Sequence, residues 1–425
     1  MSEQALSAIK RINDGQRGEQ PPPLLAFVHI PKTAGGALTT MFARAYSTEG
    51  IQKTGNYVSG REKTLNKVAG RPGRWESLRS RGVRVAVGHT PYGVFRDNLP
   101  ADTRYMTFLR EPVDRVLSHY YRHVHVPGMS DADRASRGKG RRARSLEEAL
   151  VDMRMPQLCN LCTRFLCSHP TLGSLPRSAV YEAKENLRRF AFVGLQERFA
   201  ESVVLLQRTL GLGLVPYFDR HVSAAGHRPA IDDLSDEERA LILEYNQLDT
   251  ELYGFGRGLF DQFLASAGDI GADVEQLRAV TAAAVEEHEA TIQATREWLH
   301  RELPPGGSEP IASLMARAEA AGYPRAAVTA ARRQLLVRKV KTAEGGWVFR
   351  RAAGASLSGV GDAKAWLERE LPPGASESRE ALLQRGEAAG HSRAALNRAR
   401  KALLVDKLKD PDGPWVWSHR AGYAE

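Results

Sequence analysis

The stretch that decides the fold runs from Leu24 to Gly36 and reads Leu-Leu-Ala-Phe-Val-His-Ile-Pro-Lys-Thr-Ala-Gly-Gly. Its first half is a short and almost wholly apolar run, which is typical of a strand buried in a parallel sheet. Leu38, Met41 and Phe42 follow at the spacing of one apolar helix face. The stretch therefore predicts a strand, a glycine-containing turn and a helix.

Similar apolar runs recur further along the chain. Residues 83–87, 104–109 and 190–194 each read as a buried strand, and helical patterns separate them. Alternation of strands and helices favours a parallel sheet with helices on its faces. We expect an α/β domain with a P-loop-like parallel sheet over residues 24–267.

The turn after the first strand has the composition of an anion-binding loop and reads Pro31-Lys32-Thr33-Ala34-Gly35-Gly36. A glycine-bearing turn that opens a helix directs backbone N–H groups and the positive end of the helix at an anion. Lys32 adds a positive charge, and Thr33 adds a hydroxyl donor. The loop differs from the nucleotide-kinase P-loop, because the order G-x-x-x-x-G-K-[ST] is absent.

The strand at 104–109 ends in a second candidate anion-binding segment, Arg110-Glu111-Pro112-Val113-Asp114-Arg115-Val116-Leu117-Ser118. Pro112 suits the first turn of a helix. Arg110 at the strand end and Ser118 about two turns along the helix could both reach one phosphate. Together the two segments indicate a site for a nucleotide with phosphates at both ends.

His89 is the candidate general base. It stands at the carboxyl end of the strand predicted at 83–87, which is where open α/β sheets place their sites. Histidine titrates near neutrality, as a general base should. The alternative is a histidine that only shapes a turn.

Composition limits the class of protein. The chain has 425 residues, 60 Lys and Arg against 50 Asp and Glu, a formal charge of +10 and only three cysteines. A 42% hydrophobic content excludes a wholly disordered chain, and so few cysteines exclude a disulfide-stapled secreted module. No apolar run reaches the length of a membrane span. We therefore expect a cytoplasmic protein with an anionic partner, a flexible leader at 1–23 and a mobile basic loop at 127–145.

The end of the chain contains a tandem repeat. Trp298-Leu299 recurs as Trp366-Leu367, and the same offset of 68 positions maps Leu303-Pro304-Pro305-Gly306 onto Leu371-Pro372-Pro373-Gly374 without a gap. We predict a helical linker at 268–293 and repeats at 294–352 and 362–420. Each repeat reads as three helices followed by a short strand pair, which is the layout of a winged helix-turn-helix.

The third helix of each repeat is expected to be basic on its outer side. Arg325, Thr329, Arg332 and Arg333 face outward in the first repeat, and Arg393, Asn397, Arg400 and Lys401 do so in the second. The repeats resemble winged-helix modules at the C-terminus of some phage-type primase and replication ATPase proteins. That resemblance implies DNA contact. Protein docking, self-association and a plain structural tail stay open as alternatives.

The two anion-binding segments resemble those of one enzyme family. His29-Ile30-Pro31-Lys32-Thr33-Ala34-Gly35-Gly36 looks like the phosphosulfate-binding loop of PAPS-dependent sulfotransferases, and Thr107-Phe108-Leu109-Arg110-Glu111-Pro112 through Ser118 looks like their 3′-phosphate motif. Gly88-His89 and Asn160-Leu161-Cys162-Thr163-Arg164-Phe165-Leu166 add to the likeness. The nearest branch by these motifs is the carbohydrate 2-O-sulfotransferases and their bacterial relatives.

The resemblance implies a role for each matched residue. The loop residues Pro31, Lys32, Thr33, Ala34, Gly35 and Gly36 would bind the 5′-phosphosulfate of the co-substrate PAPS (3′-phosphoadenosine 5′-phosphosulfate). Arg110 and Ser118 would hold its 3′-phosphate. Lys32 would also stabilise charge on the leaving oxygen, and His89 would take the acceptor proton. Asn160 and Arg164 would lie close to the cofactor or the acceptor, and no metal is implied.

Three competing interpretations remain at this point. Cys159, Cys162, Cys167 and His169 could ligate zinc, although their order does not fit a zinc knuckle and buried thiols explain them better. The chain could also sense PAPS or PAP without turnover, as a DNA- or protein-binding regulator, or use the loop as a small-molecule kinase. The expected acceptor of the enzyme is a hydroxyl on a carbohydrate or another small molecule.

Overall fold

The computed structural model describes residues 23–56, 73–124, 145–168, 173–218, 229–335, 337–342, 345–351, 360–372, 374–389, 391, 393–403, 405–409 and 415–418. The leader predicted at 1–23 and the basic loop predicted at 127–145 lie almost wholly outside these residues. The chain divides into two compact units, Met1–Ala283 and Ala284–Glu425. We describe each unit by itself.

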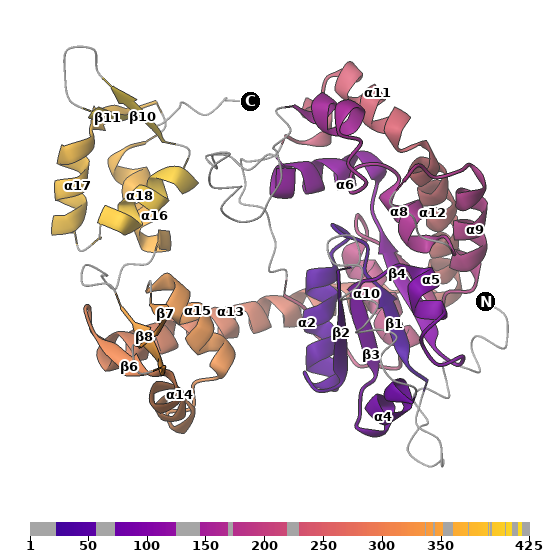
Figure 1. Ribbon diagram of the computed structural model, residues 1–425, viewed down its shortest axis with the longest axis horizontal. Helices are drawn as coiled ribbons and strands as arrows, with labels where there is room; N and C mark the ends of the chain where they lie inside the picture. The colour runs from indigo at the N-terminus through magenta and orange to yellow at the C-terminus, as the bar shows by residue number, and fades with distance from the viewer. Residues whose placement is uncertain are drawn as a thin grey trace. The chain divides into compact units, whose positions relative to one another are not determined.

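The first unit is built on a five-stranded sheet in the order β2-β3-β1-β4-β5, and every neighbouring pair is parallel (Figure 1). The strands are β1 Leu25–Val28, β2 Ile51–Asn56, β3 Val85–His89, β4 Arg104–Leu109 and β5 Phe192–Leu195. All four residues of β1 and of β5 are buried, which explains their unbroken apolar sequence. The predicted parallel α/β sheet is confirmed, and sequence patterns missed only its edge strand β2.

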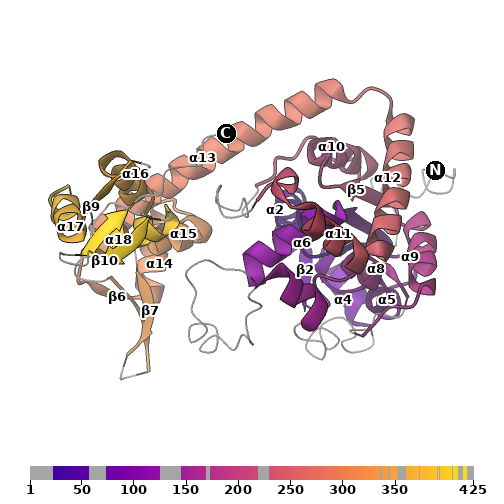
Figure 2. The same cartoon turned by 90° about the horizontal axis from the view of Figure 1, so that it is seen from above.

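Helices cover this sheet. They are α2 Gly35–Tyr46, α4 Arg74–Ser80, α5 Tyr92–Arg96, α6 Pro112–His119, α8 Leu161–Leu166, α9 Ser178–Arg188, α10 Phe199–Thr209, α11 Asp236–Tyr245 and α12 Gln247–Ala267. Helices α8, α9 and α12 pack on one another as one group in both views (Figures 1 and 2). The apolar residues predicted on α2, Leu38, Met41 and Phe42, are fully buried.

The strand order brings the candidate residues to one edge. Strand β1 lies at the centre, with β3 on one side and β4 on the other. Because parallel strands end at the same edge, the segments after β1, β3 and β4 are neighbours there. The strand order reverses around β1, and such a switch point is where α/β sheets bind ligands.

The second unit contains the two repeats, and each has the same order of elements. The first repeat consists of the end of α13 Gly271–Glu302, β6 Ser308–Pro310, α14 Ile311–Ala320, α15 Arg325–Gln334, β7 Arg338–Lys341 and β8 Trp347–Arg350. The second consists of α16 Val360–Glu370, β9 Ser376–Ser378, α17 Arg379–Ala388, α18 Arg393–Ala402, β10 Asp406–Lys409 and β11 Trp415–Ser418. Both have a three-stranded antiparallel sheet and an apolar core of their own.

The second unit begins within α13. The helical linker predicted at 268–293 belongs to α13, which runs on to Glu302. This helix contributes Val274 to the core of the first unit and Trp298 to that of the first repeat. Arg332 and Arg400 were expected to face outward. Each instead donates to a backbone carbonyl of its own repeat, Val337 or Val405, because the third helix must be joined to the strand that follows it.

Candidate functional site

The loop between β1 and α2 has a strained backbone. Lys32 and Ala34 both adopt left-handed conformations, with φ of 74° and 62°. Non-glycine residues rarely do so, and such strain gathers at sites where a ligand approaches the backbone. Between them, Thr33 is fully buried and donates its hydroxyl hydrogen to the Ile30 carbonyl at 2.9 Å. The side chain of Thr33 thus fixes the loop from inside, while the backbone turns toward the start of α2.

Gly35 is required at the first position of α2. A Cβ atom there would lie 1.9 Å from Nε2 of His29 and 2.1 Å from its Cδ2, closer than any real contact. The imidazole of His29 therefore packs directly on the backbone of the loop, and Phe27 stacks on the same ring with centroids 5.2 Å apart. A side chain at position 35 would displace the ring of His29.

The second anion-binding segment touches the first. Arg110, after β4, donates from a terminal guanidinium nitrogen to the Lys32 carbonyl at 3.1 Å. Asp114, in the first turn of α6, accepts a hydrogen bond from Nε of Arg110 at 2.6 Å. This contact fixes the orientation of the guanidinium. Glu111 caps the same helix by accepting from the Asp114 backbone N–H at 2.7 Å. The structure thus joins Lys32 and Arg110, which the sequence placed in separate motifs. Ser118 lies buried two turns along α6.

His89 ends β3 and lies beside His29. Its Nδ1 is 2.8 Å from the His29 carbonyl oxygen, and the two imidazole rings have centroids 4.1 Å apart. Because a carbonyl only accepts, Nδ1 of His89 carries the hydrogen, and Nε2 of the neutral ring has the lone pair. Burial lowers the pKa of His89 below its ordinary value, and the hydrogen bond to His29 opposes this in part. A neutral imidazole at neutral pH is the form that accepts a proton.

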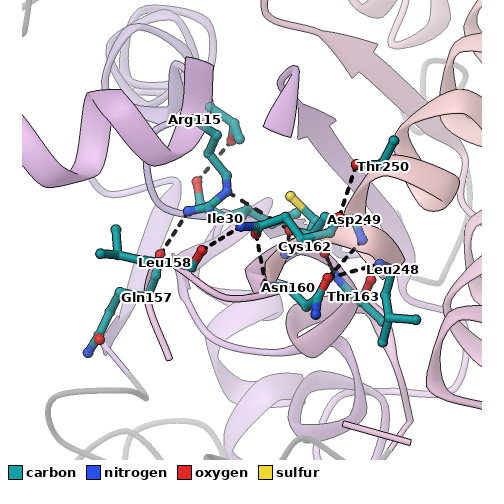
Figure 3. A network of polar contacts seen from close by, with 12 residues as sticks. Ile30, Arg115, Gln157, Leu158, Asn160, Cys162, Thr163, Leu248, Asp249 and Thr250 are labelled. Atoms are coloured by element: carbon teal, nitrogen blue, oxygen red, sulfur yellow. Dashed lines mark hydrogen bonds and ion pairs between the residues drawn. The ribbon is translucent and has the colours of Figure 1, made fainter. Parts of the chain in front are cut away.

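Asn160 is engaged in the fold. It adopts a left-handed backbone with φ of 47° before α8, and its side-chain oxygen accepts from the backbone N–H groups of Leu248 at 3.0 Å and Asp249 at 3.1 Å (Figure 3). Its own backbone N–H donates to Asn246 at 2.9 Å. Asn160 therefore caps the start of α12. Contact with a substrate by Asn160 stays a prediction.

Arg164 is also buried, on α8, and donates to the Gly173 carbonyl at 2.8 Å. Burial lowers the pKa of Arg164 from its ordinary value. Its role toward an acceptor likewise stays a prediction.

The structure contains a buried ion pair that the sequence patterns do not predict. Arg115 on α6 and Asp249 on α12 are fully buried, with Nε and Oδ2 4.0 Å apart (Figure 3). The Asp249 carboxylate accepts the backbone N–H groups of Cys162 and Thr163 at 2.9 and 2.8 Å, at the first turn of α8. Arg115 donates to the Gln157 carbonyl at 2.9 Å. This network fixes α6, which carries Ser118 and begins two residues after Arg110, to α8 and α12. No motif marks Asp249 in the sequence.

The three cysteines form no disulfide, and Cys162 and Cys167 are buried. Burial raises the pKa of the Cys162 thiol well above its usual range. Within the described part of the chain, no three His, Cys, Asp or Glu side chains come together as a metal site. His169, the fourth residue of the zinc interpretation, lies outside that part.

Comparison with known proteins gives consistent matches. A family model described as "Sulfotransferase family" matches residues 20–256, which is more than half of the chain. Heparan-sulfate 6-O-sulfotransferase 2 of Danio rerio is 30% identical over 183 residues, covering 37% of this chain and 38% of that protein. Its counterpart from Gallus gallus is 25% identical over 294 residues, covering 60% and 70%. The matched stretch thus spans well under half of the Danio rerio protein.

One solved structure is similar at low level. Mouse sulfotransferase SULT7A1 complexed with PAP is 17% identical, with coverage of 59% of this chain and 71% of that one. The TM-score of 0.26 is too low for this likeness to support an argument.

These similarities test three expectations from the sequence. The resemblance to sulfotransferases is confirmed by the family match. The finer branch differs, because the curated relatives named above are 6-O- and not 2-O-sulfotransferases. The expected cytoplasmic location is wrong, since heparan-sulfate 6-O-sulfotransferases are not cytoplasmic enzymes. No helix in the described ranges is both long and apolar enough to cross a membrane.

Proposed function

Because the chain belongs to the sulfotransferase family, we propose that it transfers a sulfuryl group from PAPS to a hydroxyl of a carbohydrate. The observation that carries the proposal is the contact between the two anion-binding segments, the Arg110 guanidinium on the Lys32 carbonyl at 3.1 Å. It brings a loop for one end of a nucleotide next to a basic group for the other end. His89, which ends the neighbouring strand β3, supplies a base at the same edge.

The loop would bind the 5′-phosphosulfate. The residues in these roles are Pro31, Lys32, Thr33, Ala34, Gly35 and Gly36. Left-handed φ at Lys32 and Ala34 turns the backbone so that N–H groups at the start of α2 converge, as in other anion-binding loops. The Lys32 ammonium adds charge where negative charge develops on the bridging oxygen. Arg110, oriented by Asp114, and Ser118 would bind the 3′-phosphate.

His89 would act on the acceptor. Nε2 of the neutral imidazole accepts the hydroxyl proton while the acceptor oxygen forms a bond to sulfur. The bond between sulfur and the 5′-phosphate oxygen breaks in line, and PAP leaves with the electron pair. Positioning accounts for much of such a transfer, as in phosphoryl transfer. The hydrogen bond from Nδ1 to the His29 carbonyl holds the ring in the required tautomer.

The acceptor class follows from the relatives. The proteins matched from Danio rerio and Gallus gallus are named for heparan sulfate, a carbohydrate polymer. We infer a carbohydrate hydroxyl as the acceptor on that basis. Transfer from sulfur-labelled PAPS to a panel of oligosaccharides and polysaccharides identifies it. Incorporation into no member of the panel, with PAP still bound, would favour a PAPS sensor without turnover.

Lys32→Ala tests the assignment of the loop. We expect kcat/KM for sulfate transfer to fall by about 10²- to 10³-fold, the cost of removing one fixed donor for developing charge. Lys53→Ala, an exposed lysine of β2 in the same unit, is the control and should change it little. Calorimetry with PAP and with 5′-AMP measures binding. Equal affinity for the two nucleotides would exclude a 3′-phosphate site at Arg110 and Ser118.

We also propose that the repeats are winged-helix modules. The support is their order of elements, namely helix, strand, two helices and an antiparallel strand pair, found twice at the same spacing. DNA or protein contact through residues 294–420 stays a prediction from the sequence.

A further inference from the structure

The two repeats share some of their basic residues, and those shared residues maintain the fold. Arg317 pairs with Glu302 at 2.9 Å, and its equivalent Arg385 pairs with Glu377 at 2.6 Å. The equivalents Arg332 and Arg400 both lie on the last core ring of their own repeat, Phe349 or Trp417, besides their backbone hydrogen bonds. These arginines are therefore not evidence for a binding partner, because each repeat uses them to join its helices to its sheet.

The repeats differ in the charge that remains. Residues 294–352 hold 11 Lys and Arg against five Asp and Glu, whereas residues 362–420 hold 11 against nine. The net charges are therefore +6 and +2. On the third helix of the second repeat, Arg393 is neutralised by Glu380 at 2.7 Å and Glu387 at 2.9 Å. The equivalent Arg325 has an alanine, Ala312, where Glu380 stands, and it is exposed.

The clearest difference lies on the strand pair. In the first repeat, Arg338 on β7 is directly opposite Arg350 on β8. In the second repeat the same register position pairs Asp406 with Ser418. Both arginines are exposed, and no ion pair to either is found among the described residues. Like charges opposite each other destabilise a strand pair, so the first repeat carries a cost that the second avoids.

Further cations lie on the opposite face of the same strand, because side chains alternate along it. Lys341 pairs with Trp347 at the end of the same ladder, and Lys339 lies over the exposed ring of Trp347 at 4.5 Å from its centroid. Two guanidinium groups side by side bind an oxyanion well, because each offers parallel N–H donors to its oxygens. The opposed arginines are therefore an anion site on the strand pair of the first repeat. The second repeat has Asp406 and Ser418 at these positions and lacks such a site.

We propose that this site binds the sulfated form of the carbohydrate polymer on which the chain acts. The inference rests on the proposed function, which makes sulfate esters on a polymer. A module that holds the polymer raises its effective concentration at an active site on the same chain. Duplex DNA is the less favoured partner, because Arg332, one of three arginines expected on the reading face of α15, is turned onto its own strand pair.

The test exchanges the pair for the residues that the second repeat carries there. The double variant Arg338→Asp, Arg350→Ser removes three units of positive charge and keeps a pairing that this fold already tolerates. The control double variant Lys364→Ser, Arg369→Asp removes the same charge from exposed parts of α16. Binding of the full-length chain to heparin, to unsulfated heparosan and to a DNA duplex is measured across a salt series.

We expect heparin to bind the unaltered chain more tightly than heparosan or DNA, and the Arg338, Arg350 variant to bind it about tenfold more weakly, with a shallower salt dependence. The control variant should lose much less. Equal losses in both variants, or DNA bound as tightly as heparin and equally sensitive to Arg338 and Arg350, would overturn the proposal.

A second measurement separates this proposal from the function on which it rests. Transfer to a short oligosaccharide acceptor should be unchanged in the Arg338, Arg350 variant, while KM for a partly sulfated polymer rises. Transfer to no carbohydrate by the unaltered chain would contradict the proposed function, whereas equal KM values for the polymer would contradict only the polymer site.

Discussion

The loop at the end of β1 and the network around Asp249 both contain polar groups. The two regions differ in how far these groups are buried and hydrogen-bonded. In the loop, Lys32 and Ala34 have left-handed backbone conformations. Lys32 and the neighbouring His89 are half-buried. In the network, Asp249 and Arg115 are fully buried, and both oxygens of the carboxylate accept backbone N–H groups. The loop stores strain beside a place for a ligand, and the network holds three helices together.

This difference separates stability from activity. Removing a partner from a buried, hydrogen-bonded pair leaves an uncompensated charge, which costs far more than the pair contributes. Removing a group from a strained and partly open loop costs little stability, because solvent can replace its contacts. We therefore expect substitutions in the network to unfold the protein, and substitutions in the loop to impair transfer in a folded protein.

The largest effect is expected for Asp249→Ala. It leaves the Arg115 guanidinium buried without a counter-charge and two N–H groups of α8 without an acceptor. The free energy of unfolding should fall by about 3–5 kcal/mol. Glu251→Ala, two residues along the same helix, removes ion pairs to Arg177 and Lys184 at the surface and should cost at most about 1 kcal/mol. Urea unfolding of both variants checks this, and equal losses would show that burial does not distinguish the two carboxylates.

A smaller effect is expected for Gly35→Ala. This substitution in the loop should lower both stability and activity. The new methyl group would overlap the ring of His29 and push it toward His89, whose ring centroid is 4.1 Å away. We expect a loss of about 1–3 kcal/mol in the free energy of unfolding, as for other overpacked positions, and slower transfer. The double variant Gly35→Ala, His29→Ala removes the clash and should recover stability relative to Gly35→Ala. No recovery would mean that backbone strain and not the ring sets the requirement for glycine.

Much of this contrast could be predicted from the sequence. Short apolar runs predict β1, β3, β4 and β5, because strands buried on both faces cannot alternate polar residues. The sequence points to Lys32, Arg110 and His89 because each stands within two residues of the end of such a run. Strand β2, Ile51–Asn56, was missed because it lies at the sheet edge and contains Gln52 and Lys53, which break the apolar pattern.

The network could not have been predicted in the same way. Asp249 lies 134 positions after Arg115, and only the packing of α6, α8 and α12 brings them together. Asn160 shows the converse problem. A family motif indicated a binding residue, and the structure gives its amide oxygen two backbone donors on α12. Helix periodicity places Arg332 on an outer face. Periodicity gives the direction of the Cα–Cβ bond only, whereas the long side chain folds back onto the backbone beside the next strand.

The smallest expected effect is a shift in the pH dependence of sulfate transfer. It tests whether the surroundings of His89 lower the pKa of its imidazole. Burial lowers the pKa of His89 from 6.5, so the neutral ring persists to lower pH than in an exposed histidine. The acid limb of kcat/KM should therefore have its midpoint below pH 6.5, and His89→Asn should remove that limb along with most of the activity. The same shift predicts that His89 contributes stability that is present above pH 6.5 and is lost as the pH falls through its lowered pKa. A midpoint above 6.5 would place the titrating base elsewhere, because no burial of a histidine raises its pKa.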